Sequence, residues 1–84
     1  MKINTQYEIG DKVWTVEYTE NDGRFHTFCR TIEYIKVNKR GEILYSFIYG
    51  IEINETRCFW FREDAEKLRV VLENTLKERG VINA

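Results

Sequence analysis

The chain has 84 residues, of which 43% are hydrophobic, 14% aromatic and 32% charged, and its formal net charge is −1. A chain of this length forms one domain, and its apolar content excludes an intrinsically disordered chain. No apolar run approaches the roughly 20 residues that a membrane-spanning helix needs, and residues 1–10 contain no apolar stretch typical of a secretion signal. We therefore expect a cytoplasmic protein with no membrane contact.

A hairpin is predicted at the start of the chain. Gly10-Asp11 is a turn signal, and residues 12–20 alternate apolar and polar side chains, as a half-buried strand does. The sequence Asn21-Asp22-Gly23 favours a tight turn, because glycine tolerates positive φ and aspartate bonds to its own backbone. The strand after this turn should pair with residues 12–20.

The second extended stretch, residues 24–38, is too long for one flat strand. Phe28 and Ile32 share one parity, whereas Ile35 and Val37 share the other. One inserted residue produces such a change of face. A β-bulge is an insertion of this kind, and it also bends the sheet. We predict a bulge or corner between Ile32 and Ile35.

Two further strands and a helix are predicted after the polar turn 38–41. Residues 42–49 are apolar on both faces, so this strand should be central or covered by the helix. Residues 50–55 should form a loop or short edge, and residues 56–61 a last strand. A helix is predicted over about 63–79, with an apolar stripe and a charged opposite side. The stripe consists of Ala65, Leu68, Val71, Leu72 and Leu76; the side opposite consists mostly of Glu66, Arg69, Glu73, Lys77 and Glu78. Gly80 and Val81 are typical of a helix stop.

These elements predict one α+β domain over residues 1–84. Residues 7–61 would form a strongly bent antiparallel sheet of four or five strands, an SH3-like barrel, and the C-terminal helix would pack across one opening. Residues 7–14, 31–37, 41–45 and 59–68 are similar to segments of small SH3-like barrel proteins encoded by phages and mobile elements. The resemblance implies a phage or prophage accessory protein that acts on a host protein. The threonine or serine usual in that family before the paired acids is absent before Glu63.

No residue forms a convincing catalytic or metal-binding pattern. His26, Ser46 and Cys29 have no partner at a spacing that would activate a nucleophile or orient a base. Cys29 and Cys58 match no zinc or redox spacing and should be reduced in the cytoplasm. Glu63 and Asp64 are adequately explained by the favourable charge of acids in a first helical turn. We expect no enzyme activity, no metal and no cofactor.

Exposed aromatic side chains are the main candidate for a binding surface. The twelve aromatic residues exceed what one small barrel can bury. Trp60 has the opposite parity to Phe59 and Phe61, so it should be exposed or half exposed, although it could instead pack on the helix or on the N-terminal arm. Exposed tryptophan and tyrosine often mark contact surfaces. We predict a protein-binding surface that includes Trp60, Tyr34 and Tyr49.

A nucleic-acid interface is the alternative. Basic residues alternate with aromatic ones in the middle of the chain, namely Arg24, Arg30, Lys36, Lys39 and Arg40. The sequence pI near 5.8 and an acidic N-terminal segment oppose this alternative.

The sequence thus favours a small, non-enzymatic protein-binding module, which uses the aromatic surface or an unpaired edge strand. A phage origin would make it a modulator or inhibitor of a host factor, such as a defence system. An exposed edge and surplus aromatics would also suit a homodimer.

Overall fold

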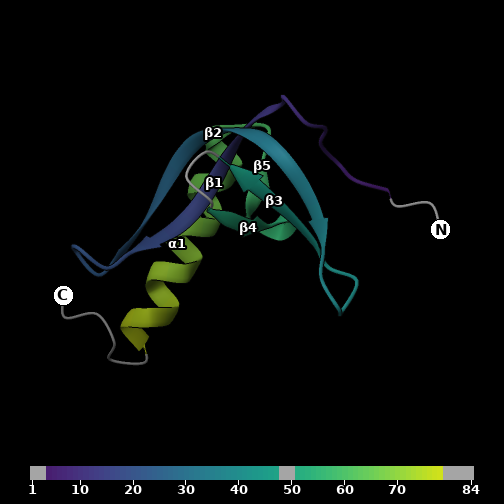
Figure 1. The fold of residues 1–84 in the computed structure, drawn as a ribbon. Coiled ribbons are helices and arrows are strands. Elements are labelled where there is room, and N and C mark those ends of the chain that lie inside the picture. The colour runs from purple at the N-terminus through teal and green to yellow at the C-terminus, as the bar shows by residue number, and fades with distance from the viewer. Residues whose placement is uncertain (1–3, 48–50, 79–84) are drawn as a thin grey trace.

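A computed structural model describes residues 4–47 and 51–78 of the chain. Within these residues there are five strands, one 3-10 turn and one helix (Figure 1). Their bounds are β1 Lys12–Thr19, β2 Arg24–Val37, β3 Ile43–Phe47, β4 Glu52–Asn54, η2 Glu55–Arg57, β5 Cys58–Phe59 and α1 Arg62–Glu78. The strands form an antiparallel sheet in the order β4-β3-β2-β1-β5. The predicted fold class, a bent antiparallel sheet followed by one C-terminal helix, is confirmed.

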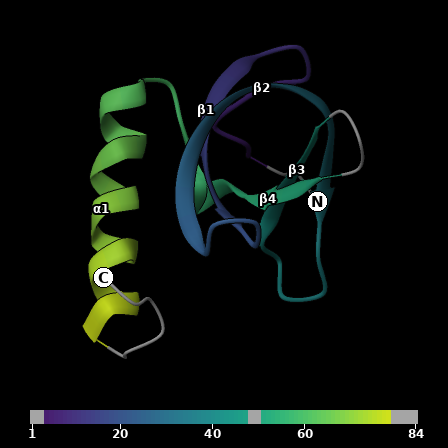
Figure 2. The same cartoon turned by 90° about the vertical axis from the view of Figure 1, so that its left-hand side faces the viewer.

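The long strand β2 belongs to both halves of the sheet. Residues 24–31 pair with β1, and residues from Ile32 onward pair with β3. The register with β3 shifts between Ile32 and Tyr34, which leaves Glu33 as the extra residue of a bulge. The predicted bulge is therefore confirmed, and β2 curves around it (Figure 2). The predicted β1–β2 hairpin is also confirmed, with Gly23 at φ 68° in its turn.

Two hydrophobic cores lie on opposite faces of β1. Val13 belongs to the core inside the bent sheet, whereas Trp14 and Val16 contact a second core with Phe25 and Ala65. Alternate residues of a strand point to opposite faces, so one strand serves both cores. Helix α1 packs against β1, β2 and β5, on the face turned away from the first core (Figure 2). The prediction that the helix closes one opening of the barrel is therefore wrong.

Several local predictions need correction. Residues 55–57 form a 3-10 turn, so Thr56 and Arg57 are not part of the last strand, which has two residues. Of the two alternatives predicted for residues 42–49, the central position is confirmed, because β3 lies between β2 and β4 in the sheet and the helix contacts the other half. Val71 is exposed rather than part of the buried stripe. The predicted stop at Gly80 and Val81 lies outside the described residues.

A hydrogen-bond network fixes the segment before β1 inside the first core. The N–H of Tyr7 donates to the Tyr45 hydroxyl at 3.3 Å, and the Tyr7 hydroxyl donates to the carbonyl of Cys58 at 2.9 Å. The Tyr45 hydroxyl in turn donates to the Glu55 carboxylate. Burial, followed by this carboxylate, raises the pKa of Tyr45 above its ordinary value, so the hydroxyl remains a donor at neutral pH.

The two thiols differ in environment, which gives the first testable prediction. Cys29 is exposed, whereas Cys58 is buried, and burial raises the pKa of the Cys58 thiol to about 12. Thiolates are the reactive form. We expect a colorimetric thiol reagent at neutral pH to titrate Cys29 rapidly and Cys58 only after denaturation. Equal rates for both thiols in the folded protein would contradict this expectation; Cys29→Ser is the variant that assigns the rapid phase.

A groove between helix α1 and the outer edge of β2

The first half of β2 is paired on one side only. Residues 24–31 pair with β1, and β3 pairs only with residues from Ile32 onward. In an antiparallel ladder, alternate residues direct their N–H and C=O groups to the same side. The N–H of Phe25 donates to a helix side chain, so it points away from β1, and Thr27 and Cys29 share its parity. Residues 24–31 therefore form an outer edge, on which Thr27 and Cys29 present N–H groups that bond to no side chain within residues 4–47 and 51–78.

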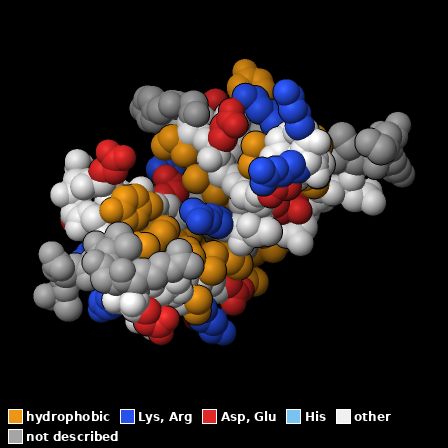
Figure 3. All heavy atoms as spheres, turned by 90° about the horizontal axis from the view of Figure 1, so that it is seen from below, with side chains coloured by type: hydrophobic (Ala, Val, Ile, Leu, Met, Phe, Trp, Pro, Cys, Tyr) orange, Lys and Arg blue, Asp and Glu red, His pale blue; other side chains and the backbone are white. Residues whose placement is uncertain are grey.

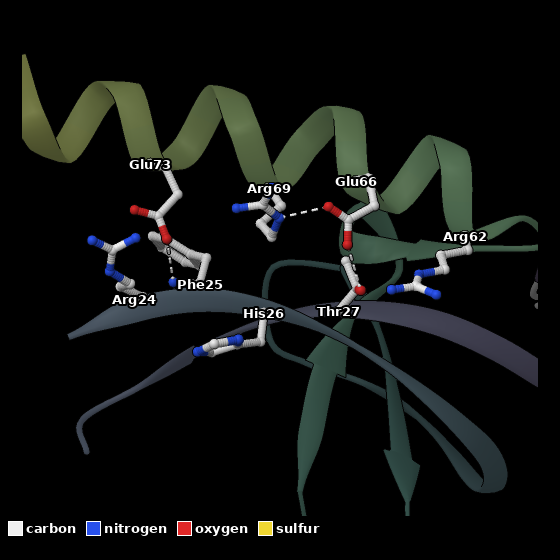
Figure 4. A pocket seen from close by; sticks show the side chains of 8 residues that line it. All are labelled: Arg24, Phe25, His26, Thr27, Arg62, Glu66, Arg69 and Glu73. Atoms are coloured by element: carbon white, nitrogen blue, oxygen red, sulfur yellow. Dashed lines mark hydrogen bonds and ion pairs between the residues drawn. The ribbon is translucent and has the colours of Figure 1, made fainter. Parts of the chain in front are cut away.

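Helix α1 presents a charged stripe to this edge. Arg62, Glu66, Arg69 and Glu73 are spaced by three or four residues, so they lie on one side of the helix. The apolar stripe of Ala65, Leu68, Leu72 and Leu76 lies next to it and packs on the second core. Burial of the apolar stripe thus orients the charged stripe toward β2 (Figure 4).

The facing residues enclose a groove of about 300 Å³. Its lining consists of Arg24, Phe25, His26, Thr27, Arg62, Glu66, Arg69 and Glu73 (Figure 4). This volume is at the lower end of the range for ligand sites. The groove is therefore large enough for a few side chains or a short backbone segment.

Glu73 is the most unusual residue of the groove. It is 6% exposed, and its Oε1 accepts the Phe25 N–H at 2.8 Å. Its Oε2 is buried and has no hydrogen-bond partner within the described chain. Buried polar atoms nearly always have a partner, because an unmet one loses its interaction with water and gains nothing in return. The sequence prediction that Glu73 belongs to the exposed side of the helix is wrong.

Glu66 bridges the helix and the strand. Its Oε1 accepts the Thr27 hydroxyl at 2.8 Å, and its Oε2 accepts Nε of Arg69 at 2.7 Å (Figure 4). The Arg69 hydrogen bond, and then that of Thr27, lower the pKa of Glu66, so this carboxylate is ionised at neutral pH.

Two arginines of the groove have no carboxylate partner. Neither Arg24 nor Arg62 forms an ion pair with any carboxylate of the described residues. The Arg62 guanidinium lies 5.5 Å from the centre of the Trp14 ring, which fixes its position without neutralising its charge. Three guanidinium groups and two carboxylates line the groove, so its charge is net positive.

His26 has a partner that the sequence did not reveal. Its Nε2 lies 2.6 Å from Oδ2 of Asp22 in the hairpin turn. A hydrogen bond from Thr19, and then one with His26, lower the pKa of Asp22 to about 2. No hydroxyl or thiol in the described part of the chain bonds to the His26 ring, and the pair joins the hairpin turn to the start of β2.

The aromatic residues predicted for protein binding are not gathered at this groove. Trp60 is 51% exposed and packs edge-on against Tyr7, with 4.8 Å between ring centres, so it is both half exposed and seated on the N-terminal arm. Tyr34 is exposed in the β2–β3 half of the sheet, whereas Trp60 follows β5 in the other half. Tyr49 lies outside the described residues.

The basic residues predicted for nucleic-acid binding are dispersed. Arg30 is engaged by Glu17 through two hydrogen bonds of 2.6 and 2.9 Å, and Lys36 pairs with Glu52 at 2.6 Å. Arg24 begins β2, whereas Lys39 and Arg40 lie in the turn after its far end. These five residues therefore form no continuous basic surface. On the face drawn in Figure 3, Lys and Arg side chains (blue) are likewise interspersed with Asp and Glu side chains (red).

Comparisons with known proteins identify no relative. No protein-family model, no curated protein and no solved structure matches the chain. Among residues 4–47 and 51–78, no helix is long and apolar enough to cross a membrane. The same residues contain no group of three metal-ligating side chains.

Proposed function

We propose that this protein is a small, non-enzymatic protein-binding module that takes an extended segment of its partner as an added strand. The observation that supports this proposal most directly is the outer edge of β2, where residues 24–31 pair with β1 alone. Extended peptides commonly bind by adding a strand to such an edge, with main-chain hydrogen bonds providing affinity.

The other edges of the sheet are less suitable. β4 has three residues and β5 has two, and short edge strands are one means by which proteins avoid unwanted pairing. On the outer edge of β2, Glu73 covers only the N–H of Phe25. Beyond it, the N–H groups of Thr27, which lines the groove, and of Cys29 are available to an added strand.

The resemblance to small SH3-like barrel proteins of phages supports a narrower version of this proposal. In that version the partner is a host protein, such as a component of a defence system, and its binding modulates or inhibits that protein. We do not extend the proposal to nucleic acid, because Arg30 and Lys36 are ion-paired and the other three predicted contacts lie at opposite ends of β2.

A proline at Cys29 tests the edge directly. Cys29→Pro removes one outward N–H without removing a hydrogen bond to β1, and edge strands tolerate proline at such positions. We expect the tagged variant to capture roughly tenfold less of the partner from nuclease-treated host lysate than the wild type does, because a main-chain hydrogen bond and its neighbours are lost. Bound proteins would be identified by mass spectrometry.

Cys29→Ser is the matched control, because it changes the same side chain and keeps the N–H. Circular dichroism and thermal unfolding would establish that both variants are folded. Undiminished capture by folded Cys29→Pro would contradict strand addition at this edge, and loss of the captured protein on nuclease treatment would favour the nucleic-acid alternative.

A further inference from the structure

We infer that the segment bound in the groove is acidic: an extended peptide whose carboxylates contact Arg24 and Arg62 and whose hydrogen-bond donor reaches Oε2 of Glu73. This inference rests on the proposed strand addition and specifies the chemistry of the partner. It follows from the charges of the groove and from its polar groups that lack a hydrogen-bond partner.

Arg24 and Arg62 account for the expected preference for an acidic peptide. Arg24 and Arg62 lie at opposite ends of the group of residues that lines the groove (Figure 4). Neither has an ion-pair partner within residues 4–47 and 51–78, whereas Arg69 is already bonded to Glu66. A guanidinium group binds a carboxylate through two parallel hydrogen bonds, which are stronger than neutral ones. An extended segment with acidic side chains at its ends would meet both arginines.

The unpartnered Oε2 of Glu73 requires a hydrogen-bond donor from the bound segment. This oxygen is a buried acceptor in a groove where Oε1 already holds the Phe25 N–H. A peptide backbone supplies N–H donors along its whole length, so one ligand can satisfy both Glu73 and the arginines. A phosphodiester backbone has no N–H group to donate to Oε2 of Glu73. The groove therefore suits an acidic peptide better than a nucleic acid.

A second copy of the chain is a poorer occupant of the same edge. The two-fold antiparallel register centred on Thr27 would place Arg24 of one copy opposite Arg30 of the other. Arg30 is already paired with Glu17, so a second copy would offer Arg24 no free carboxylate at this position. An acidic strand would instead meet Arg24 with the opposite charge.

Three synthetic peptides of one alternating pattern test this inference. Threonine alternates in each with glutamate, glutamine or lysine, and each is titrated into the ¹⁵N-labelled full chain while its amide signals are followed by NMR. We expect the glutamate peptide to shift the Thr27 and Cys29 signals and to bind roughly tenfold tighter than the glutamine peptide. The lysine peptide should cause no shift.

Charge reversal within the chain provides the matched control. The exposed pair Arg24→Glu with Arg62→Glu should weaken binding of the glutamate peptide by roughly tenfold or more. Lys39→Glu with Arg40→Glu introduces the same change of net charge at the far end of β2 and should leave the affinity unchanged. Equal losses in both double variants would attribute the preference to overall charge and overturn the assignment to this groove.

The remaining outcomes separate the inference from the proposed function. Equal binding of the glutamate and glutamine peptides at Thr27 and Cys29 would retain strand addition and overturn the acid preference. No shift of these amides with any peptide would overturn both. Shifts that depend on protein concentration alone would identify a second copy as the occupant, and shifts with oligothymidine but not with the glutamate peptide would identify nucleic acid.

Discussion

Replacing Phe47 with alanine is expected to lower the free energy of unfolding by about 3 to 5 kcal/mol. Phe47 is 2% exposed and belongs to the core inside the bent sheet, so its removal forfeits apolar burial and leaves a cavity. A domain of this size has a total stability of only about 4 to 12 kcal/mol. The variant should therefore unfold at a much lower urea concentration than the wild type, which urea titration followed by circular dichroism would measure.

Phe61→Ala is the control for this prediction, because it deletes the same side chain at an exposed position. Phe61 is 68% exposed between β5 and α1, and substitutions at such positions usually change stability by less than about 0.5 kcal/mol. A similar loss from both variants would show that the first core does not dominate the stability of the sheet.

Local signals in the sequence were sufficient to predict the strands and their connections. The turn at Asp22-Gly23 depends on the conformational preferences of two neighbours, and the bulge at Glu33 appears as a change of parity between Ile32 and Ile35. The half-exposed position of Trp60 also follows from parity, because Phe59 packs under the helix. These features are determined by residues that are close in sequence.

The groove could not be predicted in this way, because it depends on contacts between distant segments. Helical spacing predicts Glu73 on the side opposite the apolar stripe, yet it bonds to Phe25, which is 48 residues away in the chain. One signal was available: Arg62, Glu66, Arg69 and Glu73 form a charged stripe at helical spacing beside the apolar stripe. A helix stripe that contains both acidic and basic residues, next to a buried apolar stripe, indicates a polar contact with a neighbouring element.

The position of the unpaired edge also required the tertiary structure. The sequence predicted that an edge strand exists, but β2 is central from Ile32 onward and an edge before it. Only the order of strands and their register define which residues lack a second partner. The bulge at Glu33 bends the sheet, whereas the first half of β2 is open to a partner because the pairing with β3 ends at Ile32 and Phe47.

The network of Tyr7, Tyr45 and Glu55 determines how the N-terminal segment and Trp60 are held. Removing one hydroxyl by Tyr45→Phe is expected to lower the free energy of unfolding by about 1 to 3 kcal/mol, because the buried N–H of Tyr7 and the Glu55 carboxylate both lose a partner. Urea denaturation would measure this loss. Tyr18→Phe deletes a hydroxyl from an exposed tyrosine and should change stability by less than about 0.5 kcal/mol.

The same substitution has a consequence for the surface predicted from the aromatic residues. Trp60 packs against Tyr7, so weaker attachment of Tyr7 should increase the exposure of Trp60 to water. We expect tryptophan emission of folded Tyr45→Phe to shift to longer wavelength and to be quenched more readily by iodide than that of Tyr18→Phe. Unchanged emission, together with unchanged stability, would mean that the Tyr45 hydroxyl does not hold the N-terminal segment, and that Trp60 is positioned by β5 and α1 alone.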